Sequence, residues 1–148
     1  MGALLTALFT GVVALLAVLT YKARRRARAA DQALVTRREA LKELLGQQME
    51  RASVLAFSKD ATDGEVHVWF ERTCRLIDAA LGSAERNIFM QHVPSDLAVR
   101  LAREGQTVTG QLWAHQESLA NLIRRLDTLN VHETFDSVEW ATKLQGPS

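Results

Sequence analysis

The first part of the chain carries no charge, and it is followed at once by a cluster of basic residues. No charged residue occurs between Gly2 and Tyr21, and most side chains in this run are Leu, Val, Ala or Phe. As a helix rising about 1.5 Å per residue, the run would reach roughly 30 Å, the thickness of a bilayer hydrocarbon core. The pattern predicts a transmembrane anchor over residues 1–21.

The basic cluster predicts an orientation for this anchor. Its five members are Lys22, Arg24, Arg25, Arg26 and Arg28. Basic residues beside a membrane helix stay on the cytoplasmic side, where they also face anionic lipid. We therefore expect a single-pass membrane protein in contact with membrane lipid, with the amino terminus outside and the remainder in the cytoplasm.

Residues 22–57 are predicted to form a basic juxtamembrane segment and helical stalk. The segment has no proline and one glycine, and strong helix formers dominate it. An apolar stripe at helical spacing includes Leu34, Leu41, Leu45 and Leu55. Gln48 and Arg38 interrupt the coiled-coil pattern along it. Two interpretations stay open: pairing of the stripe with a second copy, or packing onto the distal domain.

Residues 58–148 are predicted to form one small helical domain. Polar turn residues at 58–64 precede apolar residues at helical spacing over 66–81. Further helices are expected over 84–93, 97–104, 108–129 and from Asp136 or Ser137 to about 144. No segment alternates with a period of two. The fold class is all-α: a membrane helix, a stalk and a bundle of about four helices.

Charge is distributed unevenly along the chain. The net charge is +1, but residues 22–51 hold nine basic and four acidic residues, whereas residues 52–148 hold nine basic and thirteen acidic ones. A mildly acidic domain is a poor binder of phosphate backbones, which argues against nucleic acid as a partner. The single cysteine, Cys74, excludes an intramolecular disulfide.

Catalytic signatures are missing from the sequence. His67, Glu71, Cys74 and Asp78 follow one helix edge at spacings of four, three and four, but metal sites need three or four converging ligands. There is no glycine-rich phosphate loop, nucleophile elbow or zinc motif. We predict a non-enzymatic protein without cofactor, metal or small-molecule substrate.

Three tryptophans are candidates for core or partner contacts. Trp69 lies on the apolar face of its predicted helix and is expected in the core. Trp113 is offset by one residue from the Leu112 stripe, and Trp140 lies on a short terminal helix. Each of these two either packs against the core or forms part of a partner surface, where tryptophan is enriched.

These observations support three hypotheses about function. The first is a membrane-anchored interaction or assembly protein whose cytoplasmic bundle binds protein partners or a second copy. The second is a small bacterial or phage membrane regulator or defence protein, acting in exclusion or immunity. The third is an inner-membrane lysis component with an exported coiled coil, which requires the opposite orientation to the one that the basic cluster predicts.

Overall fold

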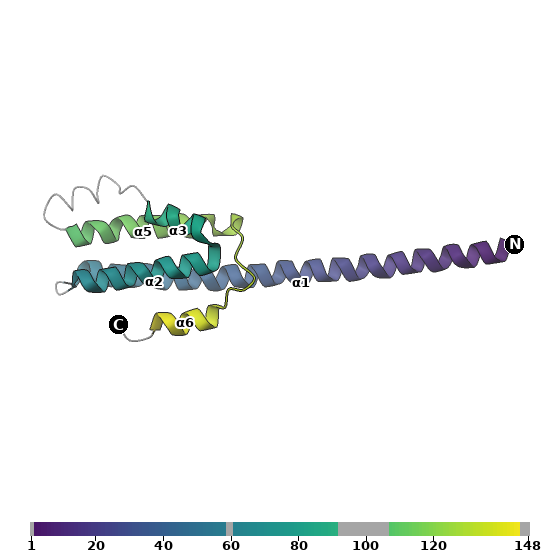
Figure 1. The fold of residues 1–148 in the computed structure, drawn as a ribbon, viewed down its shortest axis with the longest axis horizontal. Coiled ribbons are helices and arrows are strands. Elements are labelled where there is room, and N and C mark those ends of the chain that lie inside the picture. Colours follow the sequence, from purple (N-terminus) through teal and green to yellow (C-terminus); the bar gives the residue numbers. More distant parts are fainter. Residues whose placement is uncertain (1, 59–60, 92–106, 146–148) are drawn as a thin grey trace. The chain divides into compact units, whose positions relative to one another are not determined.

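The computed structural model describes residues 2–58, 61–91 and 107–145, with side chains described for 15–58, 61–91 and 110–145. Within these ranges the chain is helical and has no strand (Figure 1). The elements are α1 (Gly2–Phe57), α2 (Asp63–Leu81), α3 (Ser83–Met90), α5 (Thr107–Arg125), the short 3₁₀ helix η1 (Leu126–Thr128) and α6 (Ser137–Gln145). The predicted all-α helical bundle is confirmed. The helix predicted over 97–104 lies outside the described residues.

The chain divides into two compact units between Thr36 and Arg37. The first unit contains the beginning of α1, whose described side chains are exposed except for half-buried Leu34. The basic cluster belongs to this exposed stretch: Lys22, Arg24, Arg25, Arg26 and Arg28. The second unit contains the rest of α1 and all the later helices.

The predicted membrane anchor is not supported. Among the residues that the structure describes, no helix has a stretch both long and apolar enough to cross a membrane. Side chains are described from Leu15, and the uncharged run continues from there only to Tyr21, where the basic cluster of the same helix begins. The part of the predicted anchor before Leu15 lies outside the described side chains. This finding contradicts the predicted single-pass localisation, with the amino terminus outside and the bundle in the cytoplasm.

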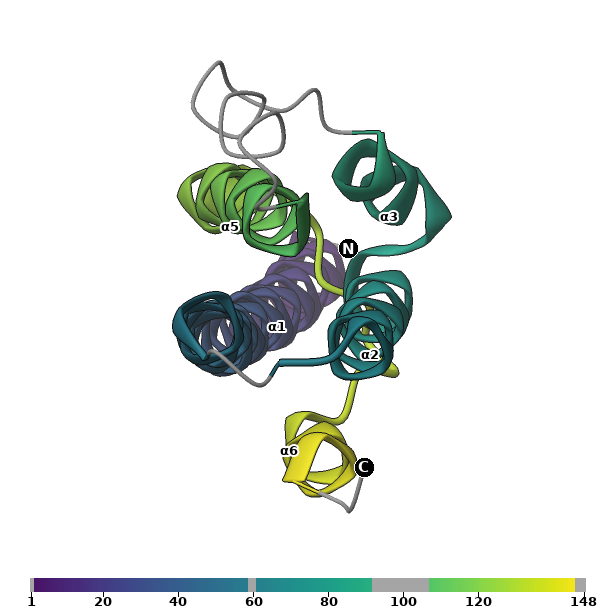
Figure 2. The same ribbon diagram turned by 90° about the vertical axis from the view of Figure 1, so that its left-hand side faces the viewer.

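The helices of the second unit form three layers. Figure 2 shows α1 and α2 side by side, with α3 and α5 on one side of this pair and α6 on the other. Arg38 Nε and Nη2 donate to the main-chain oxygen of Leu129 at 3.0 and 2.6 Å. Gln116 Nε2 donates to the main-chain oxygen of Met49 at 3.1 Å. From Arg38 to Met49 along α1, the contacted residues go back from Leu129 to Gln116. Helix α5 therefore runs antiparallel to α1.

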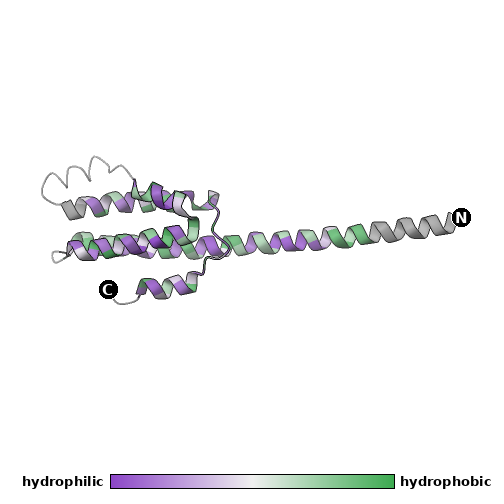
Figure 3. Ribbon diagram, in the orientation of Figure 1, coloured by the Kyte–Doolittle hydropathy of each residue, from purple (hydrophilic) through white to green (hydrophobic). Residues whose placement is uncertain are grey.

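The apolar stripe of α1 is buried in this bundle from Leu41 onward. Leu41, Leu45 and Ala52 have no exposed surface, and Gln48 is 3% exposed. Their core partners on the later helices include Trp69, Leu76, Ile77, Phe89, Leu112, Leu119 and Leu126. Apolar and polar residues alternate along the bundle helices (Figure 3), as expected when each helix buries one face. For residues 41–52, the structure favours packing onto the bundle over pairing with a second copy.

The helix ends coincide with capping residues and glycine. Thr62 caps α2, and Gly82 separates α2 from α3 with a φ of 91°, a conformation that glycine adopts without steric cost. At α6, Asp136 Oδ1 accepts hydrogen bonds from the main-chain nitrogens of Val138 and Glu139 at 2.9 and 3.2 Å. Both signals are visible in the sequence, which explains why the boundaries of these helices were predictable.

Candidate functional site

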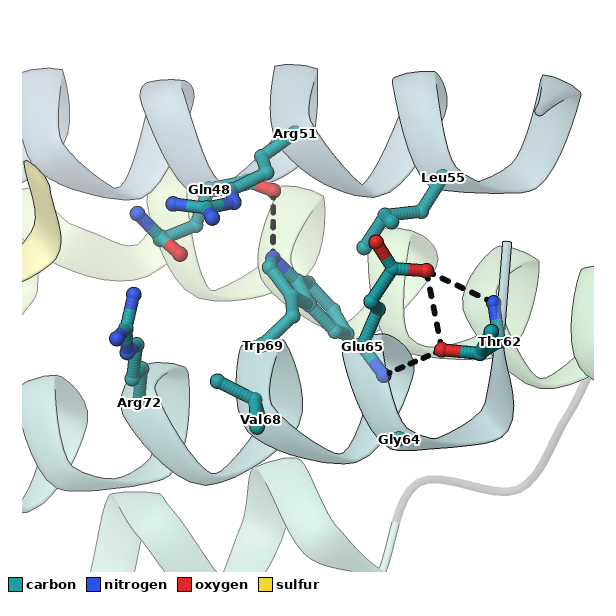
Figure 4. Close-up of a pocket in the computed structure, with 9 residues that line it drawn as sticks. All are labelled: Gln48, Arg51, Leu55, Thr62, Gly64, Glu65, Val68, Trp69 and Arg72. Atoms are coloured by element: carbon teal, nitrogen blue, oxygen red, sulfur yellow. Dashed lines mark hydrogen bonds between the residues drawn. The ribbon is translucent and has the colours of Figure 1, made fainter. Parts of the chain in front are cut away.

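A pocket of about 240 Å³ lies between the last turns of α1 and the first turns of α2. Both helix segments belong to the second unit. The pocket is lined by Gln48, Arg51, Leu55, Thr62, Gly64, Glu65, Val68, Trp69 and Arg72 (Figure 4). Leu55 and Val68 supply apolar walls from the two helices.

The indole of Trp69 is a rigid part of the pocket lining. This side chain is 2% exposed, and its Nε1 donates to the main-chain oxygen of Gln48 at 3.0 Å. Thr73, one turn further along α2, donates from Oγ1 to the oxygen of Trp69 at 2.9 Å and lies 3.5 Å from Gln48 Oε1. Buried polar atoms that are hydrogen-bonded favour one packing arrangement. These bonds therefore fix the position of α2 along α1 at this point.

One end of the pocket is closed by the start of α2. The main-chain nitrogen of Glu65 donates to Thr62 Oγ1 at 3.3 Å, and that of Thr62 donates to Glu65 Oε2 at 2.9 Å. This reciprocal pair is a capping box. The hydrogen bond from the Thr62 backbone, together with that from its side chain, lowers the pKa of Glu65 below its usual value. Its carboxylate is therefore charged at neutral pH and engaged within the protein.

The other end of the pocket is basic. Figure 4 shows Arg51 on α1 and Arg72 on α2, both away from the Thr62–Glu65 pair. Arg51 Nη1 donates to the main-chain oxygen of Leu144, in the last turn of α6, at 3.2 Å. Leu144 itself is buried. The pocket thus combines apolar walls, an aromatic lining residue and a cationic end.

Exposed apolar side chains continue along the end of α1. Val54 is 66% exposed and Phe57 is 76% exposed, three residues apart on one side of the helix. Trp113 is half-buried on α5. Gln116, one turn further along α5, has its Nε2 at 2.6 Å from Ser53 Oγ. Because α5 runs antiparallel to α1, Trp113 lies nearer than Gln116 to the end of α1. We call Val54, Phe57 and Trp113 the α1-end surface.

The two tryptophans predicted as a partner surface are not brought together. Trp113 lies on α5 and Trp140 on α6, and these helices lie on opposite sides of the α1–α2 pair (Figure 2). Trp140 is half-buried, and Lys143 Nζ lies 4.9 Å from its ring centroid. Trp69, in contrast, is in the core as predicted. A role of Trp113 or Trp140 in partner binding stays a prediction.

The helix edge with His67, Glu71, Cys74 and Asp78 does not form one site. His67 Nε2 and Glu71 Oε1 are 3.4 Å apart at the surface, whereas Asp78 pairs with Arg86 of α3 at 3.6 Å. Cys74 is buried, and desolvation raises the pKa of its thiol to about 11. Among the described residues, no three side chains of the metal-binding types converge.

No protein-family model, curated protein or solved structure matches this chain. Sequence reasoning did not find the pocket, because Arg51, Val68 and Arg72 look like ordinary surface residues of two separate helices. For the α1-end surface, the available sequence signal was a pair of apolar residues, Val54 and Phe57, one turn apart and off the apolar stripe of α1.

Proposed function

We propose that this chain is a non-enzymatic interaction protein, and that its helical bundle binds a protein partner through the α1-end surface. One observation carries the proposal. A phenylalanine 76% exposed and a valine 66% exposed lie on adjacent turns at the end of a helix that buries Leu45, Gln48 and Ala52 on its other side. Single exposed apolar residues are ordinary, but grouped ones mark interaction sites.

Burial of these side chains would stabilise a complex measurably. Covering a Val or Phe side chain contributes about 1.5–3 kcal/mol each, before the costs of association are subtracted. Trp113 adds a large aromatic ring, a residue type enriched among the strongest interface contacts. The rigid register of α1 on α2 supports the proposal further, because a preformed surface loses little entropy on binding.

Site-specific photo-crosslinking of the full chain tests this proposal. A benzoylphenylalanine is introduced at Phe57 and, as a matched control, at Val138, which is 74% exposed on α6. In cells that carry the gene, we expect one discrete adduct from position 57 and much less from position 138. An adduct of about twice the chain mass of 16.5 kDa would identify a second copy as the partner. Equal labelling from both positions, or none from position 57, would overturn the proposal.

A further inference from the structure

The pocket between α1 and α2 is suited to a side chain rather than to a cofactor. Its volume of about 240 Å³ is below the roughly 300–1,000 Å³ of pockets that enclose small-molecule ligands. Leu55 and Val68 face it from two helices, and the indole of Trp69 is fixed by its hydrogen bond to Gln48. This lining is complementary to one apolar side chain of a docked peptide.

The charges around the pocket indicate which chemical group would lie next to the apolar side chain of the docked peptide. Arg51 and Arg72 line the pocket, and its one acidic residue, Glu65, is engaged by Thr62 at the opposite end. A guanidinium group offers a planar fork of N–H donors that matches a carboxylate. Exposed Glu50 neighbours Arg51 in sequence but is not among the lining residues. The arginine end is therefore complementary to an acidic group.

The chain's own α6 illustrates how this end is used. Arg51 Nη1 donates to the oxygen of Leu144, a carbonyl in the last turn of α6. The carboxyl end of a helix carries partial negative charge. Arg51 thus already stabilises a negatively polarised group, with the side chain of Leu144 buried nearby.

We propose that this pocket binds a partner segment with one apolar anchor residue and an adjacent Asp or Glu. The anchor enters between Leu55 and Val68 against Trp69, and the carboxylate contacts the guanidinium groups of Arg51 and Arg72. This inference rests on the proposed interaction function and specifies its partner as an acidic, apolar-anchored peptide. Two parallel hydrogen bonds from an arginine to a carboxylate contribute affinity and also fix the orientation of the bound segment.

Selection from a random twelve-residue peptide library displayed on phage, with the full chain as bait, tests the inference. We expect enriched peptides to share an apolar residue next to Asp or Glu. Val68→Asp should abolish their binding, because it places a charge in the apolar wall. Arg51→Gln and Arg72→Gln should each weaken binding about tenfold, which corresponds to roughly 1.4 kcal/mol.

Arg75→Gln is the matched control, since Arg75 lies one turn beyond the pocket on α2, is exposed and pairs with Glu71 at 3.3 Å. It should leave the affinity unchanged. A peptide whose Asp or Glu is replaced by its amide should lose less affinity for the Arg51→Gln variant than for the wild-type chain, because only Arg72 still contacts the carboxylate in the variant. Circular dichroism of each variant verifies that the bundle is folded.

The outcomes separate the two proposals. Neutral or basic peptides that still require Val68 would overturn the acidic partner class and leave the proposed function intact. Failure to enrich any peptide, or binding that is insensitive to Val68→Asp, would overturn the pocket inference, while crosslinking from position 57 decides the proposed function independently. Concentration-dependent dimerisation that Val68→Asp abolishes would show that a second copy occupies the pocket, which also overturns it.

Discussion

Trp69 contributes both to the core and to the pocket. Its ring is almost completely buried, and its one polar atom donates to Gln48 on the neighbouring helix. The Trp69 ring also lies near the ring of His115 on α5, with 6.2 Å between the centroids. The His115 ring is in turn in contact with Phe70 and Phe89. From its place on α2, Trp69 thus contacts both α1 and α5, and its replacement has consequences for stability as well as for the pocket.

Replacement of Trp69 by phenylalanine should destabilise the bundle by about 2 kcal/mol. The variant loses the Nε1 hydrogen bond and leaves part of the indole volume empty, which are costs of about 1 kcal/mol or more each. Urea denaturation followed by circular dichroism measures the effect. Trp140→Phe is the control and should cost under about 1 kcal/mol, because Trp140 is half-buried. Equal losses in the two variants would contradict the role assigned to Trp69.

The thiol of Cys74 should be protected from alkylation in the folded chain. Its pKa is raised to about 11 from an ordinary value of 9.0, so at pH 8 the thiolate is about 100-fold less populated than in the unfolded chain. Iodoacetamide labelling followed by mass spectrometry should therefore be at least about 100-fold slower for native protein than for protein in urea. Complete native labelling within minutes would contradict this.

The same shift gives stability a direction with pH. Between about pH 9 and 11, the folded state retains a proton at Cys74 that the unfolded state has lost. The free energy of unfolding therefore falls as pH rises through this window. A Cys74→Ala variant should lack this part of the slope.

At the scale of elements, α2 depends on its first turn. The Thr62–Glu65 capping box pairs two main-chain nitrogens that a helix leaves without internal partners. The same turn closes one end of the pocket. Fraying of this turn would therefore alter the pocket as well as the helix.

Thr62→Ala should lower the free energy of unfolding by about 1 kcal/mol, the usual effect of a lost N-cap. Thermal denaturation at pH 7 measures it. Thr36→Ala is the matched control, because Thr36 is exposed inside α1 and its hydroxyl donates only to the carbonyl of Gln32 among the contacts described. Alanine is favoured there. A Thr62→Ala variant as stable as the wild type would show that the cap contributes nothing.

The helices were predictable where apolar spacing and capping signals agreed. The predicted helices over 66–81 and 108–129 correspond to α2 and to α5 followed by η1. Residues on their apolar sides, such as Ile77 and Leu119, are buried. Val138, in contrast, is 74% exposed, because α6 buries only Leu144 among its described side chains. Short helices offer too few repeats for spacing to identify the buried side.

Contacts between helices were beyond the reach of sequence patterns. Arg38 was expected only as an interruption of the apolar stripe, and no contact was predicted for Arg51. Both donate to main-chain carbonyls far along the chain, at separations of 91 and 93 residues. The candidate pocket depends on such contacts and was missed for that reason. The membrane prediction failed differently: it inferred a span from an uncharged run, and no described helix is apolar enough over sufficient length.

At the scale of the whole molecule, the unit that begins at Arg37 should fold by itself. It contains the whole described core, from Leu41 to Leu144, as well as the bonds made by Arg38. We expect residues 37–148 to unfold cooperatively, with a melting temperature within a few degrees of that of the full chain. Differential scanning calorimetry measures both. A fragment without a cooperative transition would show that the first unit is required.

The order of α1, α2 and α5 along the chain affects how the bundle forms during synthesis. The stripe of α1 is synthesised before Trp69 of α2, which packs against it, and well before Leu112 and Leu119 of α5, which also belong to the core. On the ribosome, this apolar side of α1 therefore stays incompletely covered until α5 has been synthesised. We expect the nascent chain to offer this uncovered apolar stripe to chaperones until the bundle is complete.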